Sequence, residues 1–445
     1  MSKIRLFGTS SGYVEIAPAA AASNNTLTAP STVGEIIAKD AAGAIGVTSV
    51  HTTNVVATGT AKVGAAVTIS ESGIEASGIG ITCANINGTQ IGGRRNIIIN
   101  GAMNVAQRGT TSTADGIHTV DRFKMGYGGE NEVLTQAQVD VSSGTSPYAE
   151  GFRKAFKITN GNQTGGFGNG DYFQVKYTVE AQDIANSGWN YTSSSSNITL
   201  SFWIKSSVAQ NFYGYLKSQD GTFRRYIFET GSLTADTWTK ITKTIPGNSG
   251  ITFNNDNGEG LILELIYFSG SDETGSVSLN TWATFVSSLR TPANTATWWT
   301  TNDSTLEITG VQLEVGSQAT PFEHRSFGEE LELCKRYYQQ INGDNNDYTG
   351  FSAYSESSTS MRAVVQLHPP MRAAFTHSKS GSFRFQGATN DSGDSAYSFS
   401  LEGVNTTFNA CTIRNTNYSG MGAADRPGNL QFRQDGSKLK FDAEF

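Results

Sequence analysis

Residues 197–205 read NITLSFWIK, a stretch with apolar side chains on both of its faces. Such a strand belongs inside a β-sandwich, because both of its faces have to be covered. Residues 261–268, LILELIYF, have the same character. Further strands are predicted at residues 238–245 (WTKITKTI) and 306–315 (LEITGVQLEV). Because turns rich in Asn, Gly and Ser separate these strands, residues 94–325 are predicted to form an antiparallel β-sandwich or jelly-roll head.

A capped helix is predicted directly after the sandwich. Ser326 and Glu329 have the spacing of a capping box, in which each side chain accepts a hydrogen bond from the other residue's backbone N–H. We expect this helix to cover residues 326–342. Its apolar face, at helical spacing, comprises Phe327, Leu331, Cys334, Tyr338 and Ile341.

The last part of the chain, residues 343–445, is predicted to form a C-terminal β tip module. It is expected to end in a hairpin, with strands at residues 430–433 and 439–445 and a turn at Asp435-Gly436. The protein is therefore predicted to be mainly β, with one short helix between two β regions.

The first quarter of the chain lacks large rings. No Phe, Tyr or Trp occurs between Val14 and Arg122, although aromatics make up 10% of the chain. Aromatic side chains supply much of the buried area of a globular core, so this part is predicted not to fold as a lone domain. Residues 1–40 are predicted to be a docking hairpin and an extended arm, with strands at residues 4–7 and 13–16. The alternative is a frayed terminus.

Residues 41–93 alternate small β-branched residues with Gly, Ala, Ser and Thr in short β-units. This pattern predicts a slender β shaft in which three intertwined copies of the chain share one core. A flexible linker is the alternative, but disordered segments are poor in Ile and Val. The predicted strands are residues 47–50, 54–57, 66–69, 73–75, 80–83 and 85–86.

Composition argues against several kinds of partner and site. The formal net charge is -7 and the sequence has no basic stripe, so no nucleic acid is expected as a partner. Cys83, Cys334 and Cys411 lie far apart without a CxxC pair, which indicates reduced packing residues rather than a zinc site or a disulfide framework. No signal peptide and no apolar run of about 20 residues is found, so synthesis in the cytoplasm without membrane insertion is expected.

Three blocks resemble tail-fibre (receptor-binding) proteins of tailed bacteriophages. They are RNIIINGAMNVAQRG at residues 95–109, VDRF at 120–123, and QLEVGSQATPFEHRSFGEELELCKRYYQQI at 312–341. The resemblance implies a homotrimer located in the virion tail. Its N-terminus would attach to a tail or baseplate adaptor protein, and its C-terminal half would bind polysaccharide or lipopolysaccharide on the host cell surface.

The predicted sandwich also resembles the carbohydrate-binding jelly rolls of glycosidases, through NITLSFWIKSS, WTKITKTI and ITGVQLEVG. Several such modules hold a structural calcium with an Asp in the closing strand. This chain has Gly310-Val311-Gln312 there, so no calcium is expected. The stretch at residues 254–259, NNDNGE, is read as a polar turn rather than a cation site.

Sugar recognition combines an aromatic ring with groups that pair with hydroxyls. Trp189 and Tyr191 in SGWNYTSSSS, and Trp298 and Trp299 in TATWWTTND, occupy turn-rich contexts and are the predicted glycan-binding residues. At most one of the two adjacent tryptophans is expected to be exposed, because neighbours on a strand face opposite ways. Trp203 and Trp238 are assigned to the core. A second candidate surface comprises Tyr348, Phe351, Tyr354, Tyr397 and Tyr418.

No catalytic motif is found, and the protein is predicted not to be an enzyme and to need no cofactor or metal. The histidines lack metal-ligand spacing such as HExxH, and neither a GxSxG elbow nor a Walker loop occurs. No carboxylate pair stands out, and Glu264 is read as an inward or edge polar residue. Two alternatives to a receptor-binding tail fibre stay open: a polysaccharide-degrading tailspike, and a structural head or collar fibre that binds no receptor.

Overall fold

The structure is a computed structural model of the 445-residue chain, which divides into two units at residues 1–82 and 83–445. Side chains are described for residues 94–343, 350–387, 400, 408–416, 423–432 and 436–445. Outside these ranges only the backbones of individual strands are described, within residues 1–93, 391–394 and 401–404.

The predicted N-terminal hairpin is confirmed. Strand β1 (Ile4–Phe7) pairs antiparallel with β2 (Tyr13–Ile16). In the predicted shaft, β3 (Ala61–Val63), β4 (Val67–Ser70) and β5 (Gly73–Ala76) form an antiparallel sheet, and β6 (Asn85–Ile86) pairs with β7 (Thr89–Gln90). The predicted strands at residues 47–50, 54–57 and 80–83 lie outside the described residues. Association of three copies stays a prediction.

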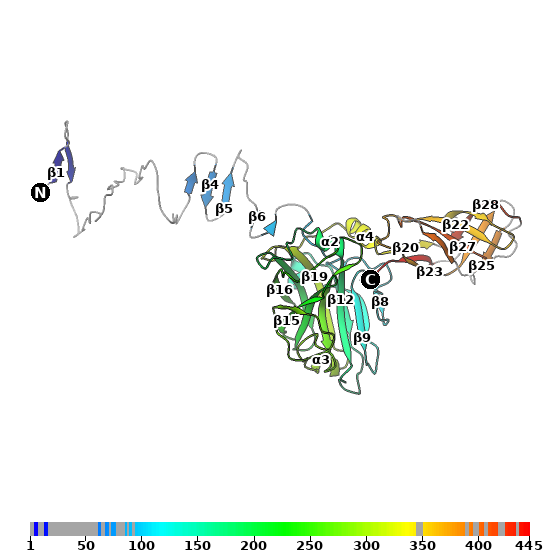
Figure 1. The fold of residues 1–445 in the computed structure, drawn as a ribbon, viewed down its shortest axis with the longest axis horizontal. Helices are drawn as coiled ribbons and strands as arrows, with labels where there is room; N and C mark the ends of the chain where they lie inside the picture. The colour runs from blue at the N-terminus through cyan, green and yellow to red at the C-terminus, as the bar shows by residue number, and fades with distance from the viewer. Residues whose placement is uncertain are drawn as a thin grey trace. The chain divides into compact units, whose positions relative to one another are not determined.

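A sandwich of two six-stranded antiparallel sheets follows, as predicted from residues 197–205 and 261–268 (Figure 1). The first sheet has the order β16 (Thr239–Pro246), β13 (Asn197–Ser206), β19 (Thr305–Val315), β11 (Lys154–Thr159), β10 (Thr135–Asp140) and β8 (Thr111–Ser112). The second has the order β18 (Trp282–Thr284), β15 (Arg224–Ser232), β14 (Asn211–Ser218), β17 (Glu259–Ser269), β12 (Tyr172–Glu180) and β9 (Lys124–Gly128). All four strands predicted from the sequence are present.

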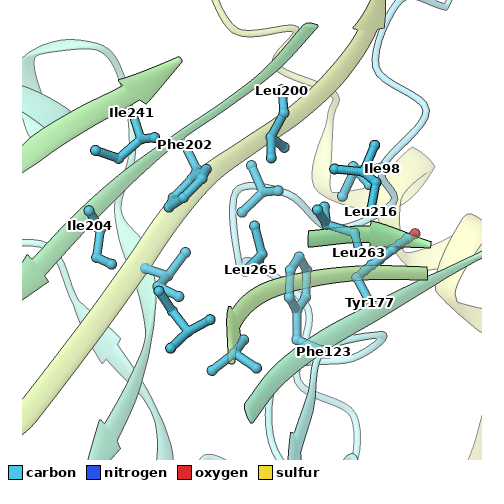
Figure 2. Close-up of a cluster of buried hydrophobic side chains, with 14 of the residues drawn as sticks. Ile98, Phe123, Tyr177, Leu200, Phe202, Ile204, Leu216, Ile241, Leu263 and Leu265 are labelled. Atoms are coloured by element: carbon cyan, nitrogen blue, oxygen red, sulfur yellow. The ribbon is translucent and has the colours of Figure 1, made fainter. Parts of the chain in front are cut away.

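The main core lies between the two sheets. Leu200 and Phe202 of β13 meet Leu263 and Leu265 of β17 in the cluster that Figure 2 shows, and all four are fully buried. Each buried Leu or Phe contributes about 1.5–3 kcal/mol relative to an exposed position. Strand β13 lies between β16 and β19 and is buried on both faces, so its sequence pattern was interpreted correctly.

The described helices are short: α1 (Ser146–Ala149), α2 (Ala181–Ala185), α3 (Thr297–Thr300) and α4 (Phe327–Lys335). None of these described helices is long and apolar enough to cross a membrane. The capping box of α4 is confirmed, because Ser326 accepts a hydrogen bond from the Glu329 N–H and the Glu329 side chain accepts one from the Ser326 N–H. Of the three cysteines, Cys334 and Cys411 are free and buried, and Cys83 lies outside the described residues.

The predicted length of this helix is wrong. Helix α4 ends at Lys335. Two residues that were predicted to lie on its apolar face, Tyr338 and Ile341, lie instead in strand β20 (Tyr338–Gly343). Phe327, assigned to the same buried face, is 59% exposed. Tertiary pairing overrides the helical spacing, because β20 forms a six-residue antiparallel ladder with β29 (Ser437–Asp442).

The C-terminal module contains two sheets. The smaller has the order β20, β29 and β23 (Thr376–Ser380). The larger has the order β25 (Asp391–Asp394), β24 (Phe383–Gly387), β28 (Arg426–Phe432), β21 (Gly350–Ser355), β22 (Met361–Gln366), β27 (Ala410–Asn415) and β26 (Ser400–Val404). The predicted terminal hairpin is also wrong: β28 and β29 belong to different sheets. Strand β29 has β20 on one side and β23 on the other, so neither of its edges is available to β28.

Candidate functional site

The structure places the predicted tryptophan pair in the core. Trp298 and Trp299 are 0% exposed, and both lie in α3, so the strand argument that one would face outward does not apply. The Trp298 ring stacks on Phe173 at 4.8 Å, and the Trp299 ring stacks on Phe268 at 6.2 Å. Their indole N–H groups donate to the carbonyl oxygens of Thr305 and Gly166. Neither ring therefore presents a face to a glycan.

The other predicted pair is brought together, but inside the fold. Trp189 is 2% exposed and its ring lies 6.3 Å from that of Tyr191. The Trp189 indole donates to the Ser196 carbonyl oxygen, and the half-buried Tyr191 ring contacts Phe253 edge-on at 4.8 Å. The polar sequence around these residues suggested exposure, whereas the rings themselves fill the end of the sandwich. The candidate glycan contact has to be sought elsewhere.

The other aromatic residues singled out in the sequence lie on the outer face of the first sheet and in the C-terminal module. Trp203 is buried, as expected, in a small cluster on the outer face of the first sheet, and the half-buried Trp238 packs against that cluster. On the predicted tip surface, Tyr354 is 40% exposed and Phe351 packs against the module's core. The three other tip residues, Tyr348, Tyr397 and Tyr418, lie outside the described residues.

A buried arginine joins the sandwich to the C-terminal module. The Arg122 side chain is 1% exposed, forms an ion pair with Glu444, and donates to the Thr178 carbonyl oxygen at 2.6 Å. Its guanidinium lies 3.3 Å from the centre of the Tyr337 ring. Burial opposes the charge, but Glu444, Tyr337 and Tyr177 together outweigh that cost, so the pKa of Arg122 is raised. The contacts fix the end of the chain against β12.

A second arginine extends this junction. Arg108 pairs with Asp442 at 3.0 Å, Glu444 at 3.6 Å and Asp121 at 3.5 Å, and its guanidinium lies 3.7 Å from the centre of the Tyr338 ring. Burial opposes the charged form of Arg108, and the three carboxylates more than compensate, so its pKa is raised. Burial also raises the pKa of Tyr338 to about 12, which keeps the phenol protonated.

Beside these two arginines lies an open pocket of about 500 Å³, which we call the junction pocket. One wall comes from the sandwich, through β8, β9 and the segment between them, and the other from β23, β29 and the chain end. The wall groups are mostly polar. They include the hydroxyls of Thr111, Ser112, Thr376 and Ser378, the imidazoles of His118 and His377, the ammonium groups of Lys124 and Lys440, and the carboxylates of Asp442 and Glu444.

No sequence pattern indicates the junction pocket. Its two walls are more than 200 residues apart along the chain, and the Arg108–Asp442 pair that joins them spans 334 residues. The VDRF block at residues 120–123 contains Arg122, but in the sequence it indicates only a resemblance to tail-fibre proteins. The dipeptide Arg122-Phe123 does not indicate that Arg122 forms an ion pair with Glu444, 322 residues later in the chain.

A buried carboxyl lies on the outer face of the second sheet. Glu264 in β17 sits between Lys176 of β12 and Tyr215 of β14, is 4% exposed, and its Oε2 has no hydrogen-bond partner among the described residues. Burial raises the pKa of Glu264 to about 7, against the opposing effects of Lys176, Arg290, Lys217 and Lys124. A carboxyl poised near neutral pH is typical of functional sites.

The segment between β17 and β18 covers this face. Val277 and Leu279 pack against a buried cluster formed by Tyr215, Ile227 and Tyr267. Beyond β18, Arg290 pairs with Glu273 at 2.9 Å and donates to the Tyr267 hydroxyl at 2.6 Å. Glu264 is thus enclosed by protein, and we treat it as a determinant of stability rather than as a ligand-binding group.

Two pockets of about 540 Å³ each flank helix α4 and share Arg94, Leu333 and Arg336. One is mainly apolar and reaches Pro369 and Pro370. The other also contains Arg95 and Arg325. Arg336 in both pockets is engaged by the buried Glu180 carboxylate through two hydrogen bonds of 2.7 and 2.8 Å.

Among the described residues, no group of three or more His, Cys, Asp or Glu side chains is arranged to hold a metal ion. In the NNDNGE stretch, Asn254 donates from its backbone and side chain to Asp220, and Asp256 accepts from the Gly258 N–H. These are the contacts of a polar turn, which is how the sequence was interpreted.

No family model and no curated protein matches the sequence. Solved structures with similarity include carbohydrate-binding modules. The N-terminal cellulose-binding domain of Cellulomonas fimi β-1,4-glucanase C has 11% identity and a TM-score of 0.24, over 48% of this chain and 99% of that domain. The family 11 carbohydrate-binding module of a Clostridium thermocellum cellulosomal cellulase has 14% identity and a TM-score of 0.22, over 48% of this chain and 98% of the module.

A tandem pair of family 22 carbohydrate-binding modules from a Paenibacillus barcinonensis protein has 9% identity and a TM-score of 0.25, over 81% of this chain and 98% of that one. These similarities are weak. The sandwich is defined by its own strand order and by the core buried between its sheets.

Proposed function

We propose that this protein is the receptor-binding tail fibre of a bacteriophage and attaches the virion to glycan on the host surface. The observation that carries the proposal is the junction pocket. Its wall combines hydroxyl, imidazole, ammonium and carboxylate groups, which pair well with the hydroxyls of a sugar and poorly with an apolar ligand. The resemblance of residues 95–109, 120–123 and 312–341 to tail-fibre proteins supports the proposal that this pocket belongs to a phage tail fibre.

Weak binding in one pocket suffices if several pockets act together. Three copies of the chain in one fibre, and several fibres on one particle, raise the effective affinity without any new contact. The N-terminal part of the chain would attach to a tail or baseplate adaptor protein. Synthesis in the host cytoplasm followed by assembly into the virion fits the two buried, unpaired thiols of Cys334 and Cys411.

Association of three copies is part of this proposal. An exposed apolar surface supports it: Phe327 is 59% exposed, and the apolar pocket beside α4 contains Leu333, Pro369 and Pro370. We expect sedimentation equilibrium of the full chain to give three times the chain mass of 47.5 kDa. A chain shortened to residues 94–445 is expected to associate more weakly, because it lacks the predicted shared core. A stable 47.5 kDa monomer of the full chain would contradict the trimer.

Glycan binding is tested by obstructing the junction pocket. Ser378 lines the pocket from an exposed position on the edge strand β23, so Ser378→Trp adds a bulky side chain there with little cost in folding. We expect the full chain to bind a subset of an array of bacterial surface oligosaccharides, and Ser378→Trp to weaken that binding at least tenfold (about 1.4 kcal/mol).

The matched control is Ser380→Trp, because Ser380 is also exposed on β23 and does not line the pocket. This variant should bind like the unmodified chain. If both variants bind normally, the glycan site lies elsewhere. If the full chain binds no glycan on the array, the attachment proposal fails, and a structural head or collar fibre becomes the better description. Release of oligosaccharide during the assay would instead indicate a degrading tailspike.

A further inference from the structure

We infer that the junction pocket selects glycans that carry an anionic substituent, and that this substituent pairs with the ammonium groups of Lys124 and Lys440. The shared chemistry is a carboxylate, or a sulfate or phosphate ester, on a sugar ring. The inference rests on the proposed glycan binding and specifies the class of glycan.

The distribution of partners among the charged groups of the pocket carries this inference. Three cations line the wall, and so do two carboxylates. Both carboxylates are already used: Asp442 pairs with Arg108, and Glu444 pairs with Arg108 and with the buried Arg122. Arg108 in turn is held by these carboxylates and by Asp121. The two arginines are thus fully engaged by three carboxylates, which leaves one carboxylate in excess among these pairs.

The two lysines that line the pocket, Lys124 and Lys440, are not part of these ion pairs. Neither Lys124 nor Lys440 forms an ion pair with any residue in the part of the chain that the structure describes, although both line the pocket. Both are half-buried. Lys124 also interacts electrostatically with Glu264, a carboxyl that is partly protonated at neutral pH because its pKa is about 7. Lys124 and Lys440 thus carry two positive charges that no direct ion pair engages, against one excess carboxylate among the arginine pairs and the partly ionised Glu264.

Their positions suit a ligand that enters between the two walls. Lys124 begins β9 on the sandwich side, and Lys440 lies in β29 on the module side, opposite Ser378 of β23. A charged hydrogen bond is about twice as strong as a neutral one. An anionic group bound by both lysines would bridge the walls, with the hydroxyls of Thr111 and Ser378 beside it for the sugar hydroxyls.

The test uses the full chain and pairs of oligosaccharides that differ only in charge. We would compare uronic-acid oligosaccharides with their methyl esters, sulfated with desulfated ones, and phosphorylated with dephosphorylated ones. We expect the acidic member of at least one pair to bind, its neutral counterpart to bind at least tenfold more weakly, and the pair that responds to identify the anion. Binding should also weaken from about 0.1 M to about 1 M salt, where the Debye length falls from roughly 10 to 3 Å.

Substitutions connect this selectivity to the two residues. Lys124→Gln and Lys440→Gln should each reduce binding of the acidic glycan about tenfold or more. Lys438→Gln is the matched control, because Lys438 lies two residues from Lys440 on the same face of β29 and does not line the pocket. Its affinity should be unchanged. The two substitutions lie on different walls, so a folding defect in one variant leaves the other informative.

The outcomes separate the inference from the function on which it rests. The inference is overturned if the chain binds only neutral glycans, or if it still binds acidic glycans after both lysine substitutions. The proposed glycan attachment is kept in either case, provided that Ser378→Trp still blocks glycan binding. Absence of binding to every glycan overturns the proposed function itself.

Discussion

Replacing Arg122 by Met should destabilise the protein by about 3–5 kcal/mol. The substitution leaves the Glu444 carboxylate, whose side chain is 8% exposed, without its closest ion-pair partner. It also removes the hydrogen bond to the Thr178 carbonyl oxygen and the guanidinium contact with the Tyr337 ring. Removing one partner of a buried ion pair has this cost because the other charge stays buried and uncompensated. Calorimetric unfolding of the full chain measures the effect.

The control is Lys154→Met, which removes an ion pair with Asp140 of 2.6 Å between side chains that are 38% and 82% exposed. An exposed pair contributes about 0–1 kcal/mol, so this variant should unfold almost like the unmodified chain. The double variant Arg122→Met, Glu444→Gln should recover part of the loss, since it also removes the buried carboxylate that has lost its closest partner and keeps only the longer contact with Arg108. Equal destabilisation by Arg122→Met and Lys154→Met would show that Arg122 does not hold the junction.

Replacing Glu264 by Gln should stabilise the sandwich at pH 8 and leave it nearly unchanged at pH 4. Burial raises the pKa of Glu264 from 4.5 to about 7, so ionisation is less favourable in the folded than in the unfolded chain. A difference of this size corresponds to about 3 kcal/mol in the free energy of unfolding. Gln resembles the protonated acid and cannot ionise.

The direction of this pH dependence follows from the raised pKa of Glu264. The stabilisation that a protonated Glu264 provides is fully present below pH 4.5 and is lost as the pH rises through about 7. The difference in unfolding free energy between the Gln variant and the unmodified chain should therefore grow between pH 4.5 and 7 and then level off. Chemical denaturation at a series of pH values measures this difference, and other titrating groups cancel in it.

Glu259→Gln provides the comparison, because Glu259 also lies in β17 and pairs with a lysine but has a side chain that is 33% exposed. Its effect should be small and should not grow between pH 4.5 and 7 in the same way. If Glu264→Gln shows no pH-dependent difference, the carboxyl is solvated in solution and the segment between β17 and β18 does not enclose it.

Local sequence patterns predicted the parts of the fold that depend on local rules. Strands β13 and β17 are runs of apolar residues, and they are central strands because such residues need cover on both faces. The capping box at Ser326 was predictable because its two residues lie three positions apart. In each case the residues that make the structure are neighbours in the sequence.

The predictions failed where residues far apart in the sequence determine the local structure. Tyr338 and Ile341 fit the face of a helix, yet they pair with β29, about 100 residues later in the chain. Trp298 and Trp299 occupy a polar context, but rings from β12 and β17 cover them. The junction pocket depends on the Arg122–Glu444 pair, whose members are 322 residues apart. No local pattern carries that information.

A crystal structure of the full chain with the tightest-binding oligosaccharide from the array would locate the glycan site. We expect sugar density in the junction pocket, in contact with Ser378 and with at least one of Lys124 and Lys440. Density on the exposed surface of the tip module around Tyr354, or anywhere else on the chain, with an empty junction pocket would contradict it.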